Sequence, residues 1–561
     1  MNIQEKKTLR RPVRSSALFF AFTLLTRAVA LLTTPVFTRM LTPTEYAVIP
    51  LYLTWHTLFS SLITLELTGS VLLAVMAKHK EKIDAILSST LSLCLLSLLF
   101  FFGIYLAVAP QIESFTGLSR PLMLLLFLHT AASLPLTLYS AKAKYLYRPE
   151  RTFFLLIVTS VAAPLLGIVL LIFTRAGALS RILATVICTL AVAIPLGIHL
   201  IRQGRTLVSL PLFRELLRRG LPLFPHYVAL SAMGELGRLF VSRYSTPDAL
   251  SKLGIAATIA HGVTMLTGAI NAAFFPWLLR RLRRGERERV RRMSSTVIYT
   301  VLLVTLAVSL LAPEAIALLA PVEYRGATEA ILPLLFATFP AFLYTLFAGV
   351  TLYRERTLAM TVATLVSASI GVLSQLYLVP RYSYVGAAYA TALSYLTLAL
   401  SHLIVCAQGE KGQWHTSALF PVHPDHRMRD GKLKRTSPLF PRVSRANTCA
   451  QPILGREEGN ILSAYRQESR VSNLPCATKD EKEIRAPLAR PLNQKDNLPA
   501  PLLTILLSLA LSALSMLLIP PLFSRPLLRY LLLIPTALAL FLILYRRRTE
   551  ITEARRPKEP Q

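Results

Sequence analysis

The chain has 561 residues, of which 53% are hydrophobic and only 16% charged, and its formal net charge is +32. Soluble domains carry about 25% charged residues, so this composition excludes an ordinary soluble globular protein. The five cysteines show no metal-ligand spacing and predict neither a disulfide framework nor a metal site. No motif calls for a cofactor.

Apolar runs long enough to cross a bilayer, about 20 residues each, recur along the chain. They predict an all-α polytopic membrane protein with about fourteen transmembrane helices. The predicted spans are Ser15–Thr38, Val48–Val75, Ile83–Ala109, Pro121–Ala141, Thr152–Thr174, Leu179–Ile201, Gly220–Ser242, Leu253–Leu278, Met293–Leu319, Ala330–Leu352, Leu358–Val379, Val385–Cys406, Leu502–Ile519 and Leu527–Tyr545. The first run follows a basic tail and contains Arg27, so we interpret it as a retained helix and not as a cleaved signal peptide.

The positive charge alternates from loop to loop. Basic clusters precede the first span and follow the second, fourth, sixth and eighth, and the densest is Arg280–Arg292. The opposite loops carry one or two basic residues each, such as Arg39 and Arg120. This positive-inside pattern predicts that both termini are cytoplasmic and explains the net charge without a nucleic-acid partner. The Arg280–Arg292 run is also suited to anionic lipid headgroups.

Landmarks in the first two hundred residues recur in the next two hundred. The pairs Arg39 and Arg243, Arg151 and Arg356, and Arg175 and Arg381 are separated by 204, 205 and 206 residues. A slowly drifting offset is typical of a duplicated unit. Each unit holds an even number of spans, so both copies enter the membrane from the same side. The repeat therefore predicts two parallel six-helix lobes with a transporter-like site between them.

The predicted organisation has five parts. Residues 1–203 form the N-terminal lobe and residues 204–406 the C-terminal lobe. Residues 407–500 are polar and lack apolar periodicity, which predicts a disordered cytoplasmic loop, although its abrupt edges also fit an inserted or mis-framed segment. Residues 501–546 add two transmembrane helices, and residues 547–561 form a cytoplasmic tail.

Several motifs resemble one family. They are Leu24–Ala28, Pro35–Tyr46, Arg219–Pro225, Phe275–Trp277, Leu378–Tyr382 and Val385–Thr391. Over about Ser15–Cys406 the chain resembles the polysaccharide-biosynthesis (Wzx-type) flippases of the multidrug/oligosaccharidyl-lipid/polysaccharide exporter superfamily. It departs from them at Ala47 and Gly237, where the family usually has Gly and Asp. The two additional helices at the C-terminus resemble the arrangement of lipid II flippases.

The resemblance implies a flippase that carries undecaprenyl-pyrophosphate-linked oligosaccharide across the bacterial inner membrane by alternating access. Its partners would be this substrate, membrane lipids, and a coupling cation or the membrane potential. The translocated oligosaccharide would be used to build a cell-surface polysaccharide such as lipopolysaccharide O-antigen. Two alternatives remain open. A drug/cation antiporter of the same superfamily would need a defined carboxylate site. A membrane glycosyltransferase or polymerase would need acidic catalytic residues or a sizeable outer loop, and the short outer loops here favour a transporter over an enzyme.

Charged and polar residues inside predicted spans are the candidate site residues, because burying them in a bilayer is costly unless they face an internal cavity. The candidates for substrate binding are Arg27, Arg238 and Asn271, and those for ion coupling are Glu66, Glu235 and His261. A planar guanidinium can bind two phosphate oxygens, which places Arg27 first. Each candidate also has a structural interpretation.

In that structural interpretation, Glu66 neutralises Arg27, Glu235 pairs with Arg238 on one helix face, and Asn271 ties helices together. His129 lies in the fourth predicted span. Like His261, it can titrate near neutral pH or serve as a helix-packing hydrogen-bonder.

Overall fold

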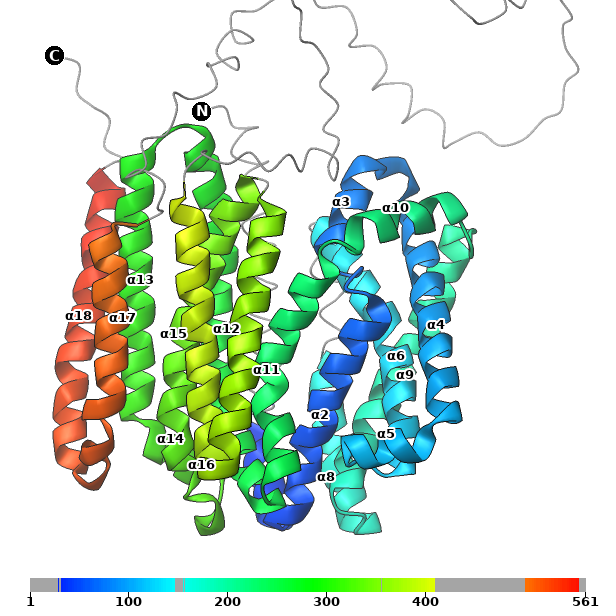
Figure 1. Ribbon diagram of the computed structural model, residues 1–561, viewed down its shortest axis with the longest axis horizontal. Helices are drawn as coiled ribbons and strands as arrows, with labels where there is room; N and C mark the ends of the chain where they lie inside the picture. Colours follow the sequence, from blue (N-terminus) through cyan, green and yellow to red (C-terminus); the bar gives the residue numbers. More distant parts are fainter. Residues whose placement is uncertain are drawn as a thin grey trace, which may run out of the picture. The chain divides into compact units, whose positions relative to one another are not determined.

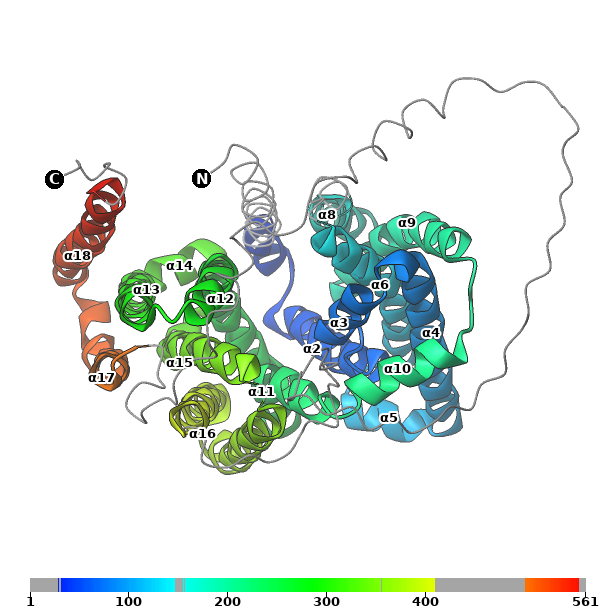
Figure 2. The same cartoon turned by 90° about the horizontal axis from the view of Figure 1, so that it is seen from above.

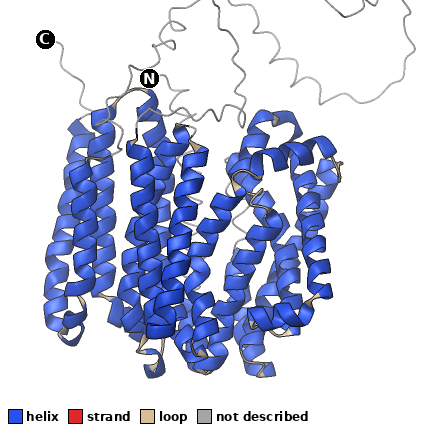
Figure 3. Ribbon diagram, in the orientation of Figure 1, coloured by secondary structure: helices blue, strands red, loops and turns tan. Residues whose placement is uncertain are grey.

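The computed structural model describes residues 32–146, 157–354, 356–408 and 500–553, together with the single positions 29 and 155. All regular structure in these ranges is helical (Figure 3). Within them, nine helices are long and apolar enough to cross a membrane, and two shorter apolar helices span Val158–Thr174 and Leu502–Leu518. The predicted all-α polytopic membrane fold is confirmed. Arg27 and residues 409–499 lie outside the described residues.

Two helix bundles and a C-terminal pair make up the described structure (Figures 1 and 2). The N-terminal bundle consists of α2 (Pro43–Thr64), α3 (Ser70–Lys78), α4 (Ile83–Ala107), α5 (Ala109–Thr116), α6 (Arg120–Tyr145), α8 (Ala163–Thr174) and α9 (Ala178–Gly204). The C-terminal bundle, which follows the linking helix α10 (Leu210–Gly220), consists of α11 (Phe224–Tyr244), α12 (Pro247–Arg283), α13 (Arg287–Leu310), α14 (Ala312–Leu319), α15 (Ala327–Tyr353) and α16 (Thr357–Ala407). The C-terminal pair is α17 (Leu502–Leu518) and α18 (Pro526–Glu553).

One predicted span contains a break that hydropathy did not reveal, and a second break lies between two predicted spans. The second span is divided between α2 and α3, because Leu65 and Glu66 adopt left-handed φ values of 49° and 52°. The eleventh and twelfth predicted spans both belong to α16, and the break that separates them is at Ser383, where φ is 53° and ψ is −135°. Non-glycine residues adopt such conformations only when the surrounding packing imposes them, so both breaks are built into the fold.

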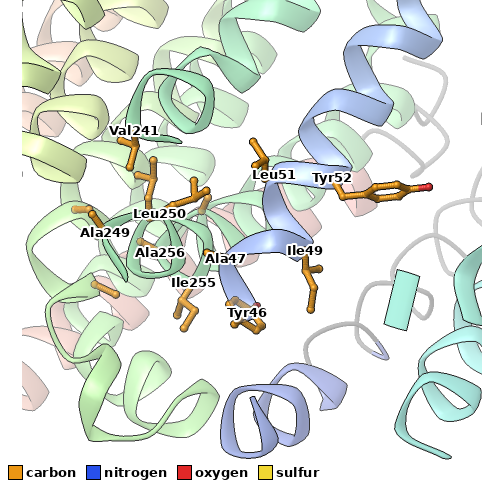
Figure 4. Packing of buried hydrophobic residues seen from close by; sticks show 14 of the residues in the cluster. Tyr46, Ala47, Ile49, Leu51, Tyr52, Val241, Ala249, Leu250, Ile255 and Ala256 are labelled. Carbon is orange, nitrogen blue, oxygen red and sulfur yellow. The ribbon is translucent and has the colours of Figure 1, made fainter. Parts of the chain in front are cut away.

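The two bundles meet where α2 packs against α11 and α12. Figure 4 shows this contact, in which Ala47 of α2 lies near Ile255 of α12. Tyr52 of α2 points away from α12 and into the N-terminal bundle in the same view. One side of α2 therefore serves the contact between the bundles, while the other belongs to the N-terminal core.

The two bundles share local geometry at equivalent positions of the predicted repeat. Thr42 and Thr246 are the N-cap residues of α2 and α12, and each side chain accepts a hydrogen bond from a backbone N–H of the first turn. Gly177, between α8 and α9, has φ 58° and ψ −137°, close to the values at Ser383. The offsets between these pairs are 204 and 206 residues.

We expect that replacing Gly177 with any residue that has a side chain strains the backbone. Its φ of +58° is unfavourable for an L-residue, and an added Cβ would lie 3.0 Å from Oε1 of Glu45. We predict that Gly177→Ala destabilises the protein by about 1–3 kcal/mol. The midpoint of thermal unfolding in detergent micelles should fall. Gly103→Ala on α4 is the matched control, because a Cβ there meets nothing within 4 Å, and an equal fall in both variants would contradict the prediction.

The linking helix α10 is attached to the end of α3 by an ion-pair cluster centred on Glu215. Its carboxylate lies 2.8 Å from Lys78 Nζ, 2.9 Å from His79 Nε2 and 3.1 Å from an Arg219 nitrogen. Burial acts to raise the pKa of Glu215, but the hydrogen bonds from Lys78 and His79 and their charges outweigh it, so the pKa lies below the ordinary 4.5. The cluster fixes the helix that connects the two bundles.

This cluster gives α10 a pH-dependent attachment. Because the folded-state pKa of Glu215 is lowered, its contribution to stability is complete above the ordinary carboxyl pKa and disappears as the pH falls through the folded value. Hydrogen exchange of α10 should therefore be faster in Glu215→Gln than in the parent at neutral pH, and the difference should vanish in acid. A difference that persists unchanged in acid would show that Glu215 acts through packing and not through charge.

The C-terminal pair packs against the C-terminal bundle, α17 on α13 and α15 and α18 on α13. Arg529 of α18, only 3% exposed, donates 2.9 Å to Glu314 of α14 and 3.2 Å to the Leu310 carbonyl. Tyr530 donates to the same carboxylate at 2.9 Å. The two predicted additional helices are present and are attached by buried charge as well as by apolar packing.

Candidate functional site

A cavity of about 400 Å³ lies where the two bundles meet. We call it the inter-bundle cavity. The residues around it come from α2 and α9 of one bundle, from α11 and α12 of the other, and from the helical stretch 32–40 that precedes α2. They are Thr34, Tyr46, Ile49, Pro50, Leu53, His56, Thr57, Arg181, Glu235, Arg238, Gly254, Thr258, His261, Gly262 and Met265. A smaller cavity of about 120 Å³ within the C-terminal bundle shares Arg238 and His261 with it. A space lined by both bundles changes shape whenever one bundle moves against the other.

Arg238 and Glu235 form an ion pair on one face of α11. The Arg238 Nη1 lies 2.5 Å from Glu235 Oε2, and both side chains are only 12% exposed. The same carboxylate oxygen accepts a 2.6 Å hydrogen bond from Thr54 of α2 in the other bundle. The spacing of three residues predicted this pairing. The pair neutralises two buried charges and connects the bundles at the cavity wall.

Arg181, in the first turn of α9, is the second guanidinium of the cavity. Its Cζ lies 4.4 Å from the centroid of the Phe37 ring, a cation–π arrangement. Its Nη1 is buried and has no hydrogen-bond partner among the described residues, which also provide no carboxylate for it. A buried guanidinium with an unused donor is suited to an anion that enters the cavity.

The charge of the cavity follows from these residues. Among the described residues that line it, two are arginines and one is a glutamate, so the wall carries a net single positive charge when its histidines are neutral. Hydroxyl groups of Thr34, Thr57 and Thr258 add polar surface next to this charge. The arrangement favours an anion with several hydrogen-bond acceptors.

The structure brings three of the six predicted site residues together: Arg238, Glu235 and His261 line the inter-bundle cavity. Glu66 is not on this wall; it lies at the break between α2 and α3 and accepts a hydrogen bond from Ser61, whose hydroxyl is also 3.2 Å from Ser231 of α11. Asn271 is on α12 away from both cavities, and its Oδ1 is buried without a hydrogen-bond partner among the described residues. Arg27 lies outside the described residues.

Two cavity residues, Arg181 and His56, were absent from the predicted set. Both lie inside predicted spans, where a charged or titratable side chain is itself the signal for a functional position. Arg181 was missed because it lies only two residues inside the start of its predicted span, a position that also suits a residue at the membrane interface.

Comparisons with known proteins agree with this architecture. Residues 13–282 match the family model described as polysaccharide biosynthesis protein. No curated protein sequence matches the chain. Among solved structures, the chain is similar to a multidrug resistance MATE family transporter of the MOP superfamily in its inward-facing conformation, with 15% identity, a TM-score of 0.51, and coverage of 68% of this chain and 95% of that one.

A second solved structure is similar to the same extent. The lipid II flippase MurJ, in an inward closed conformation, matches at 15% identity with a TM-score of 0.53, covering 69% of this chain and 87% of that one. At this identity the two likenesses show the fold. Residues 13–282, just under half of the chain, are thus similar to the polysaccharide biosynthesis protein family, and the chain has the fold of these two membrane proteins, one a transporter and the other a flippase.

Proposed function

We propose that this protein is a flippase that moves undecaprenyl-pyrophosphate-linked oligosaccharide across the cytoplasmic membrane. The observation that carries the proposal is the net positive inter-bundle cavity, whose wall combines Arg181 and Arg238 with several hydroxyl groups. A pyrophosphate diester is an anion rich in acceptor oxygens, and arginine binds such groups through paired N–H donors. The family match of residues 13–282 supports a lipid-linked glycan as substrate.

In this proposal, Arg181 and Arg238 contact the two phosphates from opposite bundles. Arg27, in the first predicted span, is a third candidate phosphate contact, and Asn271 a candidate contact for the sugars. Alternating access follows if the bundles rock against each other, since contacts made from both walls hold the anion only while the walls are close. Glu66, Glu235 and His261 remain the candidates for ion coupling, and the membrane potential is the other energy source.

The proposal places the protein in the bacterial inner membrane with both termini in the cytoplasm. The end of α3, the linking helix α10 and the turn between α12 and α13 lie at one end of the helices in Figure 1, and all three segments are rich in basic residues. Positive loops remain on the cytoplasmic side. The matching caps at Thr42 and Thr246 and the matching backbone of Gly177 and Ser383 support two parallel lobes from a duplicated unit, at 1–203 and 204–406.

A drug/cation antiporter is the second candidate function. Its support is the fold shared with a multidrug resistance transporter. An organic cation would need an available carboxylate, but Glu235 is held by Arg238 at 2.5 Å. The cavity therefore favours the anionic substrate. A strain expressing the protein should show no added export of ethidium, and ethidium export abolished by Glu235→Gln would favour the antiporter.

Depletion of the protein in its native host tests the proposed function. If it flips the lipid-linked glycan, depletion should remove the surface polysaccharide and cause its lipid-linked precursor to accumulate on the cytoplasmic leaflet. Precursor can be extracted and quantified, and its leaflet determined with an impermeant lectin on right-side-out and inverted vesicles. Loss of the polysaccharide without precursor accumulation would point to a role in synthesis and contradict the proposal.

A further inference from the structure

Two histidines from neighbouring helices are stacked beside the inter-bundle cavity. The rings of His56 on α2 and His129 on α6 lie with centroids 3.9 Å apart and planes inclined by 19°. The Tyr52 hydroxyl is 3.4 Å from His129 Nδ1. His56 lines the cavity, and its Nε2 is buried without a hydrogen-bond partner among the described residues. We call His56 and His129 the histidine dyad.

The stacking limits how many protons the dyad can hold. A neutral imidazole has one ring nitrogen that can accept a proton. Two imidazolium rings 3.9 Å apart would repel each other strongly away from water, so the pair can carry at most one added charge. A single imidazolium, by contrast, is stabilised by the π face of its neutral neighbour. The geometry is therefore that of a site for one proton.

The groups that face the dyad determine when that proton binds. Helix α2 packs against α4, α6, α9, α11 and α12. The titratable or charged side chains that these helices and α2 itself present toward this region are Tyr46, Tyr52, Tyr105, His129, Arg181, Glu235, Arg238 and His261. The Tyr105 hydroxyl of α4 already donates a 2.8 Å hydrogen bond to Glu113. The fixed charges nearby are thus the two arginines, which oppose protonation, and Glu235, which Arg238 already neutralises in part.

An anion in the cavity reverses this balance. The described lining carries a net single positive charge, from Arg181, Arg238 and Glu235. A pyrophosphate diester carries two negative charges, so its arrival leaves one negative charge uncompensated inside the protein. Burying an unpaired charge is costly. One proton on the dyad, at the wall of the same cavity, would restore neutrality.

We propose that the histidine dyad is a proton-binding site that takes up one proton when a pyrophosphate diester enters the inter-bundle cavity and releases it when the anion leaves. This inference rests on the proposed function, since it needs an anionic substrate. Linkage makes the effect reciprocal: the anion promotes protonation, and protonation tightens anion binding by the same factor. Substrate binding should consequently weaken as the pH rises through the titration of the occupied dyad.

Counting protons tests this directly. The probe is the symmetrical dimethyl diester of pyrophosphate, whose own phosphates do not titrate near neutral pH. Isothermal titration calorimetry of the full chain in nanodiscs, in two buffers of different ionisation enthalpy, gives the number of protons taken up per anion bound. We expect net proton uptake by the parent protein and its loss in His56→Gln. His129→Gln, a second variant in case the first does not fold, should also lose it.

Two further histidines separate the dyad from other sources of protons. His199→Gln on α9 is the matched control, because this histidine is exposed, does not line the cavity, and has its ring 6.4 Å from that of Tyr139, so proton uptake should be unchanged. Loss of uptake in His261→Gln with retention in the dyad variants would overturn the proposal. If the parent protein binds the anion without taking up a proton, the proposed proton-binding role of the dyad is wrong, while the proposed function is unaffected. If the parent protein does not bind the anion at any pH, both the proposed function and the proposed proton-binding role of the dyad are wrong.

Discussion

Replacing Arg181 by alanine is expected to lower glycan export by about 10- to 100-fold, because a hydrogen bond between ionised groups contributes about 1.5–3 kcal/mol. Its Nη1 donor has no partner among the described residues, so the free energy lost should come from the substrate complex and little from folding. Arg181→Lys keeps the charge but not the two-pronged donor, and export should be partly retained. The measurement is surface polysaccharide per unit of folded protein in a depletion strain.

The control for this experiment lies at the other end of the same helix. Arg202 is an exposed residue near the C-terminal end of α9 and is far along the chain from the cavity-lining first turn. Arg202→Ala removes the same charge and should leave export near the parent level. Export by Arg181→Ala at the parent level, with normal membrane insertion, would remove Arg181 from the substrate site.

Breaking the Arg238–Glu235 pair should destabilise the protein, whereas removing both charges should restore stability without restoring transport. Each single alanine variant leaves a largely buried charge without its partner, which costs on the order of 3 kcal/mol. In the double variant neither charge remains, so the thermal midpoint should recover. Export should still be lost, because the proposed phosphate contact is absent. Thermal unfolding and export would be measured on the same four proteins.

The exposed ion pair of Arg292 and Glu288 is the control for this double-mutant experiment, since surface pairs contribute at most about 1 kcal/mol to the free energy of folding. Neither its single nor its double replacement should change the thermal midpoint or export appreciably. If the double variant of Arg238 and Glu235 exports glycan at the parent rate, Arg238 is a structural partner of Glu235 and not a phosphate contact.

Much of the fold could be predicted from the sequence. Each apolar run after the first contains helix in the structure. Hydropathy over about 20 residues predicts this because a helix of that length must be apolar to cross the hydrocarbon core of a bilayer. The helix starts at Thr42 and Thr246 were visible as Thr-Pro pairs. The pairing of Glu235 with Arg238 followed from their spacing on one helix face.

The break between α2 and α3 and the cavity could not be predicted in the same way. Leu65 and Glu66 are unremarkable in sequence, and their left-handed backbone arises from tertiary packing that the local sequence does not specify. Arg181 and His56 enter the site because α9 and α2 happen to converge there with α11 and α12. Convergence of distant segments is a property of the assembled bundles. Sequence reasoning could identify the charged positions within spans but not which of them meet.

The central claim is that the protein itself moves a lipid-linked pyrophosphate glycan between leaflets. The most direct measurement uses purified full-length protein in proteoliposomes containing a fluorescent undecaprenyl-pyrophosphate oligosaccharide, with an impermeant quencher added outside. We predict that a much larger fraction of the fluorophore becomes accessible than in protein-free vesicles, and that Arg181→Ala behaves nearly like the protein-free control. Equal accessibility with and without the parent protein, under an imposed pH gradient and membrane potential of either sign, would contradict the account.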